Sequence, residues 1–438
     1  MLRKIPNMKV QNCNTISAFG GINFVFKFLE EGNLDNFFNK YFPRLANQSI
    51  YSWKDIIYSI LSIYLCGGDC IEDLQLHLKP HFQKNPFVNL PSSDTVLKRL
   101  KELSDNNNHC FAKRGTVEHT YNRNLKLEEL NVALLEKFGA FSKDDLTIDY
   151  DNTILFNEKS DSKMTYKRNP GYQPGVCTLN EEQVLYIENR NGNSDAKSFQ
   201  RDTLERIFTL LRSKGIRKAD HFRADAASYQ FDVINLLKEE VNNFYIGCRN
   251  SYIEKYYPQI SEWESITDTT NETIEIGEIT ITPFRQQSRR NKTAPQEYRL
   301  IVKRKPNNDG QLNLFTQDHY EYRSILTNNK HWSAAQIARF YNHRGNMERQ
   351  FDILKNDFGW NCMPFSRLSQ NTVFLYITAI CRNLYHYIIR YFSERISSLK
   401  PNFRVKKFLF RFIILPAKWV KRSRQNYLKL YGELKFST

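Results

Sequence analysis

The chain of 438 residues is long enough for two or three domains, each with its own hydrophobic core. Hydrophobic residues make up 41% of it and aromatic residues 14%, which excludes a largely disordered protein. The formal net charge of +16 predicts a polyanionic partner, with nucleic acid as the first candidate and an anionic membrane surface as the second.

The sequence predicts neither a membrane-spanning helix nor a secretory signal. No run of about 18 apolar residues occurs, and the N-terminal stretch MLRKIPNMKVQNCN has no long apolar core. The eight cysteines are scattered singly. The closest pair, Cys66 and Cys70, has no second pair and no histidine partner at zinc spacing. We therefore expect reduced, mostly buried thiols in a cytosolic protein, and no zinc site.

The N-terminal part of the chain has helical hydrophobic spacing from residue 20 to about residue 138. One helix is predicted over Trp53–Leu65, and a later one has Ser93 or Asp94 as its cap. The outer faces of these helices are basic. We interpret residues 1–140 as a helical DNA-binding region, although a basic solvated face is the commoner meaning of this pattern.

The character of the sequence changes at residues 146–156, LTIDYDNTILF, which have the composition of a strand. Because side chains alternate along a strand, Asp149, Asp151 and Thr153 are expected on one face. Two carboxylates on one face of a central strand are costly unless a metal ion or a cation balances them.

The elements predicted after this strand have an order that indicates a fold. Two strands form a hairpin around residues 180–182, and they are followed by helix 194–213, a strand ending at Asp225, a further helix and strand 244–249. This is the order of a ribonuclease-H-like fold, a mixed sheet flanked by helices. Its first strand is central and pairs with the strand after the first helix, so Asp151 and Asp225 should approach each other.

The rest of the chain divides by composition. We assign residues 141–250 to the first part of this catalytic core, 251–330 to a β-rich insertion, 331–400 to the second part of the core, and 401–438 to a basic tail. The insertion alternates like exposed antiparallel strands and is rich in Arg and Lys, which indicates phosphate contact or a solubilising edge.

Two apolar stretches lie in the C-terminal part of the chain. Residues 373–392 predict a core helix, and polar residues such as Arg382 and Asn383 argue against a membrane span. Residues 401–438 hold ten Lys or Arg and one acidic residue, with aromatic residues interleaved. Within them the segment FLFRFIILP, residues 408–416, is interpreted as a strand.

The stretch 341–358, YNHRGNMERQFDILKNDF, is predicted to lie on one helix of about seven turns, from a capping box at Ser333 to Gly359. At about 100° per residue, four polar side chains fall within a sector of about 60°. They are Tyr341, Arg344, Glu348 and Lys355. Their row runs along the edge of the stripe that must be buried, so a carboxylate there lies near the core. The alternative is an exposed ion pair between Arg344 and Glu348.

Asp151, Asp225 and Glu348 can be brought together from two strands and a helix. Three carboxylates in one place need divalent cations, and hard oxygen ligands suit Mg²⁺ or Mn²⁺. Two such ions about 4 Å apart can activate a water or a 3′-hydroxyl and stabilise the departing oxygen at a phosphodiester.

One sequence signature is specific: Tyr341, Arg344, Glu348 and Lys355 match the pattern Y-x-x-R-x-x-x-E-x-x-x-x-x-x-K residue for residue. One group of bacterial insertion-sequence transposases with a DDE site carries this YREK signature. The chain resembles that group over roughly residues 45–430. LTIDYDNT and FRADAASY resemble its two aspartate motifs. Within the group, DxDxT, RAD and the LPSSDT segment are most similar to the thirteen-eighty-type insertion sequences.

The resemblance implies a transposase that cuts transposon ends and joins them to target DNA. Asp151, Asp225 and Glu348 would be the catalytic, metal-binding acids, holding two Mg²⁺ or Mn²⁺ ions. Asp149 is the second choice for the first acid, because the family's first aspartate precedes a Thr or Ser by two residues, as Asp151 precedes Thr153.

The other signature residues, Tyr341, Arg344 and Lys355, would contact phosphates of the transposon end. The partners implied are the terminal inverted repeats and target DNA, no membrane, and a second copy of the chain in a homodimer. The location implied is the bacterial cytoplasm, at the nucleoid. The alternatives are a nuclease of the same fold without strand transfer and an inactive, transposase-derived DNA-binding protein.

Overall fold

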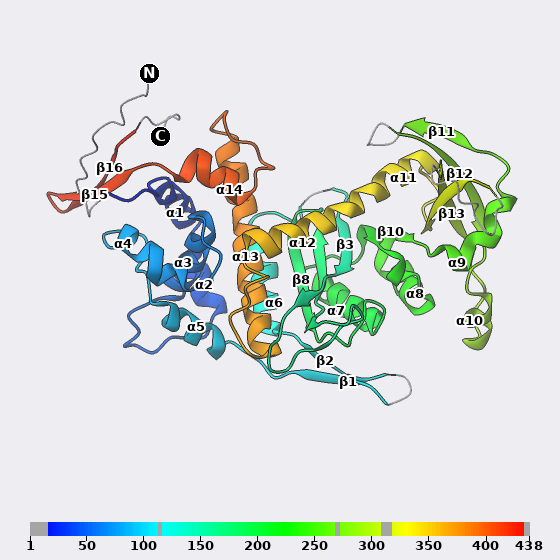
Figure 1. Cartoon of the computed structure of the whole chain (residues 1–438), viewed down its shortest axis with the longest axis horizontal. Coiled ribbons are helices and arrows are strands. Elements are labelled where there is room, and N and C mark those ends of the chain that lie inside the picture. Colours follow the sequence, from blue (N-terminus) through cyan, green and yellow to red (C-terminus); the bar gives the residue numbers. More distant parts are fainter. Residues whose placement is uncertain (1–15, 113–115, 143, 268–271, 308–317, 433–438) are drawn as a thin grey trace, which may run out of the picture. The chain divides into compact units, whose positions relative to one another are not determined.

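The computed structural model describes residues 16–112, 116–142, 144–267, 272–307 and 318–432 (Figure 1). The chain divides into two compact units. The smaller unit comprises residues 1–103, 356–364 and 384–438, and the larger comprises residues 104–355 and 365–383. These units divide the chain at other points than the predicted domains, because residues 104–140 belong to the larger unit and residues 401–438 to the smaller.

The first half of the smaller unit is helical, as the sequence predicts. Its elements are α1 (Ile22–Glu31), α2 (Leu34–Tyr41), α3 (Trp53–Leu65), the π-helical turn η1 (Leu74–Leu78), α4 (Lys79–Phe82) and α5 (Ser93–Glu102). Helix α3 has the predicted bounds and begins with a capping box formed by Ser52 and Asp55. Helix α5 begins one residue earlier than predicted, because its cap is Ser92, whose hydroxyl accepts a hydrogen bond from the Thr95 amide at 3.3 Å.

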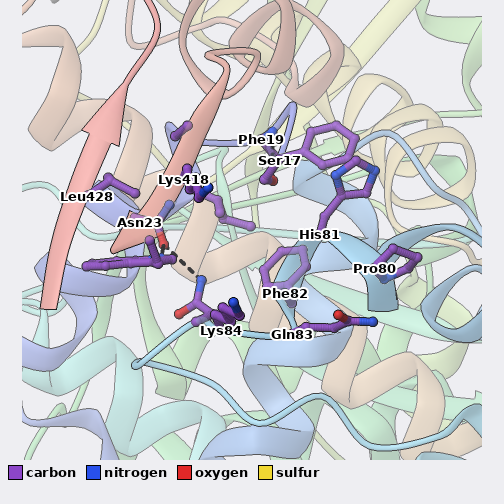
Figure 2. A pocket seen from close by; sticks show the side chains of 14 residues that line it. Ser17, Phe19, Asn23, Pro80, His81, Phe82, Gln83, Lys84, Lys418 and Leu428 are labelled. Carbon is purple, nitrogen blue, oxygen red and sulfur yellow. Dashed lines mark hydrogen bonds between the residues drawn. The ribbon is translucent and has the colours of Figure 1, made fainter. Parts of the chain in front are cut away.

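The C-terminal residues complete this unit. Their elements are α14 (Val405–Phe408), the π-helical turn η5 (Leu409–Ile413), β15 (Ala417–Arg422) and β16 (Gln425–Leu430). The prediction of a strand over residues 408–416 is therefore wrong. The indole nitrogen of Trp419, in β15, donates to Oδ1 of Asn23, in α1, at 3.1 Å. A cavity of about 230 Å³ lies beside this contact, between α4 and β15, and Figure 2 shows its lining.

The larger unit is built on one mixed sheet of eleven strands among the described residues. Its strand order is β1-β2-β8-β7-β3-β9-β10-β14-β13-β12-β11. The strands are β1 (Asn108–Phe111), β2 (Glu118–Asn122), β3 (Thr147–Asn152), β7 (Gly175–Leu179), β8 (Gln183–Arg190), β9 (Ala219–Ala224), β10 (Val241–Gly247), β11 (Glu264–Thr267), β12 (Thr273–Ile281), β13 (Tyr298–Pro306) and β14 (Tyr320–Thr327). The hairpin of β1 and β2 was not predicted from the sequence, which is otherwise helical there.

The centre of the sheet has the predicted pairing. Strand β3 lies between β7, to which it is antiparallel, and β9, to which it is parallel. Buried side chains of these strands pack with α6 (Leu125–Lys137), α7 (Gln200–Arg212) and α8 (Phe231–Glu240) in one hydrophobic core. Helix α7 begins six residues later than the predicted helix 194–213. Strand β3 ends at Asn152, earlier than the predicted strand.

The β-rich segment after β10 extends the same sheet. Its three longest strands, β12, β13 and β14, were predicted, and β14 pairs directly with β10 in antiparallel register. Shorter helical elements are α9 (Asn250–Ile253), η3 (Glu254–Gln259) and α10 (Arg285–Arg290). The sequence Asn-Asn-Asp-Gly at residues 307–310 predicts a turn between two of these strands, and residues 308–310 lie outside the described residues.

A run of helix crosses the sheet, as Figure 1 shows in yellow, and it consists of α11 (Ala334–Asn342), the 3₁₀ turn η4 (His343–Gly345) and α12 (Asn346–Asp357). The predicted capping box is confirmed, because Ser333 and Gln336 bond to each other's backbone amides. The predicted single helix has its 3₁₀ turn at Gly345, the residue with the lowest helix propensity in this stretch.

The helix after this run is α13 (Leu368–Ser393), and it is apolar and buried as predicted. Its residues up to Asn383 belong to the larger unit, where the Tyr376 hydroxyl donates to the Ile187 carbonyl at 2.8 Å. No helix in the described part of the chain is long and apolar enough to cross a membrane.

Candidate active site

Asp151 and Asp225 stand at neighbouring ends of two parallel strands. In the register of β3 and β9, Tyr150 lies opposite Ala224, and each aspartate is the next residue of its strand's path. Asp225 also caps the short helix η2 (Ala226–Ser228), with Oδ1 accepting from the Ala227 amide at 3.0 Å. Burial, followed by the negative charge of nearby Asp225, raises the pKa of the Asp151 carboxyl to about 7. The two carboxylates are thus close enough to repel each other.

Arg344 lies between two of the predicted acids. Its Nη1 is 3.6 Å from Oδ2 of Asp151 and 3.8 Å from Oε1 of Glu348. The Arg344 side chain is largely buried, whereas 77% of the Glu348 side chain is exposed. Glu348 therefore faces solvent beside the two aspartates, and its carboxylate oxygens remain accessible to a ligand.

The other two signature residues bond to the protein backbone. The Tyr341 hydroxyl donates to the Ala224 carbonyl at 3.1 Å. A methyl group in place of hydrogen at Gly247, in β10, would come within 2.5 Å of that hydroxyl oxygen, so the packing requires glycine. Nζ of Lys355 donates to the Ile154 carbonyl at 3.0 Å. Burial lowers the pKa of the Lys355 ammonium group, and nearby Lys167 lowers it further.

Asp149, two residues before Asp151, has a different environment. It is fully buried, and both of its oxygens accept from the guanidinium of Arg223 at 2.7 Å. Arg223 also donates to the Phe340 carbonyl and to Glu181, each at 2.8 Å. Asp149 is therefore part of a buried ion pair that links β3, β9 and the end of α11.

The sequence as a whole decides the class of protein. Residues 7–435 match the family described as "Transposase DDE domain group 1". The chain belongs to the DDE transposases. It is therefore an enzyme that cuts DNA and transfers strands, and its family uses divalent metal ions.

Several solved transposases resemble this one. A piggyBac transposase in a synaptic complex with hairpin DNA has 12% identity and a TM-score of 0.42, over 90% of this chain and 80% of that chain. A Mos1 transposase complex with the left transposon end has 16% identity and a TM-score of 0.16, over 49% and 64%. A Mos1 complex with Mn has 15% identity and a TM-score of 0.17, over 50% and 65%. No curated protein matches the chain.

The charges of the three predicted acids fit divalent cations, and their spacing is wide. A bound cation would relieve the repulsion between Asp151 and Asp225, and Glu348 offers a third carboxylate, which is exposed. Among the described residues, only Asp69, Cys70 and Asp73 have potential ligand atoms all within 4.8 Å of one another. The three predicted acids are thus spaced more widely than that, and Arg344 lies between two of them.

Sequence reasoning missed the residues that bind α12 to the sheet. Glu181, in the turn between β7 and β8, accepts from Asn346 Nδ2 at 2.7 Å and from Arg223. Its carbonyl accepts from Gln350 Nε2 at 3.0 Å. Although burial raises the pKa of the Glu181 carboxyl, these partners and His343 lower it below its ordinary value. Arg223, in the RAD segment, could have been found as a charged residue inside a predicted buried strand.

Proposed function

We propose that this DDE transposase belongs to the YREK-signature group of bacterial insertion-sequence transposases, closest to the thirteen-eighty type. The full signature, with Arg344 and Glu348 beside Asp151, supports that grouping. We also propose a ribonuclease-H-like core. The order β8-β7-β3-β9-β10, with β3 parallel to β9 and β9 parallel to β10, supports it.

The proposed catalytic acids are Asp151, Asp225 and Glu348, which would hold two Mg²⁺ or Mn²⁺ ions. The observation that carries this proposal is the placement of Asp151 and Asp225 at adjacent ends of β3 and β9. Divalent ions bound there would activate a water or a 3′-hydroxyl and stabilise the oxygen that leaves a phosphodiester. Asp149 is not proposed, because Arg223 occupies both of its oxygens.

The proposed roles of the other signature residues concern DNA. Nη1 of Arg344 lies 3.6 Å from Asp151 and 3.8 Å from Glu348, so it can bind a phosphate that approaches the acids. Lys355 would add a second phosphate contact. For Tyr341, whose hydroxyl is bonded to the Ala224 carbonyl, the proposed phosphate contact would require exchange of that bond.

The proposed DNA substrates are the element's terminal inverted repeats and a target duplex. Two ends must be brought together for transposition, so we propose a homodimer in the DNA complex. We propose that the protein works in the bacterial cytoplasm, at the nucleoid. The net charge of +16 supports a DNA partner.

The test combines the full-length protein with Mg²⁺, a labelled duplex carrying the end of its own element, and a supercoiled target plasmid. Wild type should give joined product. Glu348→Gln and Asp225→Asn should bind the labelled end but neither cut nor join it. Glu129→Gln, at an exposed acid on α6 in the same unit, is the matched control and should behave as wild type.

Each other outcome has a definite meaning. Normal cutting by Glu348→Gln would contradict the assignment of Glu348. Cut ends without joined product would favour a nuclease of the same fold. Binding by wild type with neither cutting nor joining would favour an inactive DNA-binding protein.

A further inference from the structure

A small sheet directly follows Asp151 in the chain. It comprises β4 (Leu155–Phe156), β5 (Lys163–Met164) and β6 (Pro170–Tyr172), in the order β4-β6-β5. We call residues 155–172 the small-sheet segment. The carbonyl of Ile154, at its start, accepts from Lys355, and the Ser160 hydroxyl donates to the Ser366 carbonyl at 2.6 Å. The segment is thus attached to the same helix that carries Glu348.

Hydrogen bonds and close packing hold the small-sheet segment in one conformation. The Asp161 carboxylate accepts from the Tyr172 hydroxyl at 2.5 Å and from the Leu368 amide at 2.8 Å. The main chain around Gly171 and Gly192 is packed so closely that a Cβ at either would lie within 2.5 Å of a carbonyl oxygen. A surface on this segment is therefore preorganised, and binding to it costs little conformational entropy.

The segment nevertheless leaves large aromatic side chains in solvent. Phe156 is 53% exposed and Tyr166 is 66% exposed. Phe156 and Lys163 both lie opposite Gly171, so they share a face of the sheet. Tyr166 stands in a tight turn closed by a hydrogen bond from the Thr165 amide to the Asn169 carbonyl at 2.9 Å.

Cations accompany these rings. The segment has four Lys or Arg and two acidic residues, and one of those acids is Asp161, which is bonded internally. Lys167 and Arg168 follow Tyr166 directly and are exposed. An exposed aromatic residue alone is common on protein surfaces. In this transposase the rings and cations lie on a segment that is bonded at its start to the helix of Glu348 and has Lys167 near Lys355. Exposed rings among cations have the chemistry of a surface for single-stranded nucleic acid.

Stacking of aromatic side chains on bases distinguishes single-stranded DNA from duplex DNA. In an intact duplex the base faces are stacked on each other, so an aromatic side chain gains contact with a base only where the strands are opened. The phosphates are accessible in both forms, and the higher charge density of the duplex attracts the cations at least as strongly as a single strand does.

We propose that the small-sheet segment binds unpaired nucleotides of the DNA next to the cleavage site, with Phe156 and Tyr166 stacking on bases and Lys167 and Arg168 contacting phosphates. This inference rests on the proposed function, because it takes Asp151, Asp225 and Glu348 as the cleavage site. It adds a subsite with a stated preference for single strands over duplex.

The test measures the affinity of the full-length protein for labelled oligo(dT) and for a blunt duplex of equal length, by fluorescence anisotropy. Tyr166→Ala and Phe156→Ala should each weaken oligo(dT) binding about tenfold, and duplex binding less than about twofold. Tyr166→Trp should retain the wild-type affinity because it keeps a stacking face. Tyr252→Ala, an exposed tyrosine of the same unit at 55% exposure, is the matched control and should change neither affinity.

Other results would overturn the inference. Equal loss on both DNAs would mean that the rings support phosphate contacts only, and unchanged affinities would remove the segment from the DNA surface. A change in oligomeric state without a change in affinity would make it a contact between copies of the chain. Cleavage of element ends by the wild-type protein is measured in parallel. Normal cleavage would support the proposed function even if this inference fails.

Discussion

Asp149 and Asp151 are two residues apart on one strand, and their surroundings give them different tasks. Asp149 is fully buried and has a bidentate bond to Arg223. Asp151 lies at the end of β3 beside Asp225 and Arg344, where a carboxylate can accept a ligand. Removing one partner of a buried ion pair is strongly destabilising, because the other charge stays buried alone. A carboxylate held near a like charge destabilises the fold until a cation binds between them. The first residue is suited to holding the fold and the second to chemistry.

We predict that Asp149→Asn and Asp151→Asn separate stability from activity. Asp149→Asn should lower the free energy of unfolding by about 3 kcal/mol, because Arg223 stays buried with half of its charge partners removed. Asp151→Asn should leave stability equal to or above that of wild type and abolish cleavage. Urea unfolding and the end-cleavage assay measure the two effects. An Asp149→Asn variant of full stability that fails to cut would reverse the roles of the two acids.

The candidate site could be predicted in part because its signals are local. The period of a helix places Tyr341, Arg344 and Glu348 on one side, and the structure keeps them there across the 3₁₀ turn. Glu181 has no such local pattern, and the sequence around Arg223 indicates only a charge inside a buried strand, without its partners. Their meaning depends on contacts between residues far apart in the chain, such as the bond from Asn346 to Glu181, and no periodicity reports those.

The C-terminal element shows why a local pattern can mislead. The sequence of residues 408–416 was interpreted as a strand. In a strand, Phe408, Phe410 and Phe412 would all share one face. In a helix, Phe408 and Phe412 share a face and Phe410 points away. The structure has the helical arrangement, with Phe408 fully buried, Phe412 nearly so and Phe410 71% exposed. Alternation and helical spacing coincide in this short apolar run, so only its packing partners could decide between them.

We predict that Phe408→Ala and Phe410→Ala differ sharply in stability. The Phe408 ring lies 5.0 Å from the ring of Phe412 and 5.7 Å from that of Tyr385, measured between centroids. Its loss should lower the free energy of unfolding by about 3–5 kcal/mol, because a large cavity opens in the core. Phe410→Ala is the matched control in the same turn and should change it by less than about 0.5 kcal/mol. Similar losses for both would restore the strand interpretation.

At the scale of secondary-structure elements, the strands were easier to predict than the strands with which they pair. The alternation of β12, β13 and β14 was visible in the sequence. Their continuation of the central sheet, through the pairing of β14 with β10, was not, because nothing local specifies which edge an antiparallel strand joins. The order of strands around β3 could be predicted because few topologies fit three strands, a helix and a further strand.

Across the whole molecule, the excess of positive charge is the property that most directly concerns DNA. Many cations are engaged with acids, as Arg212 is with Glu205 and Glu240. Lys355 is different, because its ammonium group donates to a backbone carbonyl and the repulsion from nearby Lys167 outweighs the attraction of Asp352. A cation whose neighbour repels it gains more from a phosphate than one already paired with carboxylates.

We therefore predict that Lys355→Ala and Arg212→Ala have different effects on the salt dependence of DNA binding. Each phosphate contact releases condensed counterions, so the slope of log affinity against log salt should become shallower by about one for Lys355→Ala. Affinity at low salt should fall about tenfold. Arg212→Ala, the matched control with a paired cation, should leave the slope unchanged. Fluorescence anisotropy of a labelled element end over a salt series, without divalent ions, gives both slopes. An unchanged slope for Lys355→Ala would mean that its bond to Ile154 persists in the complex and that other cations hold the phosphates.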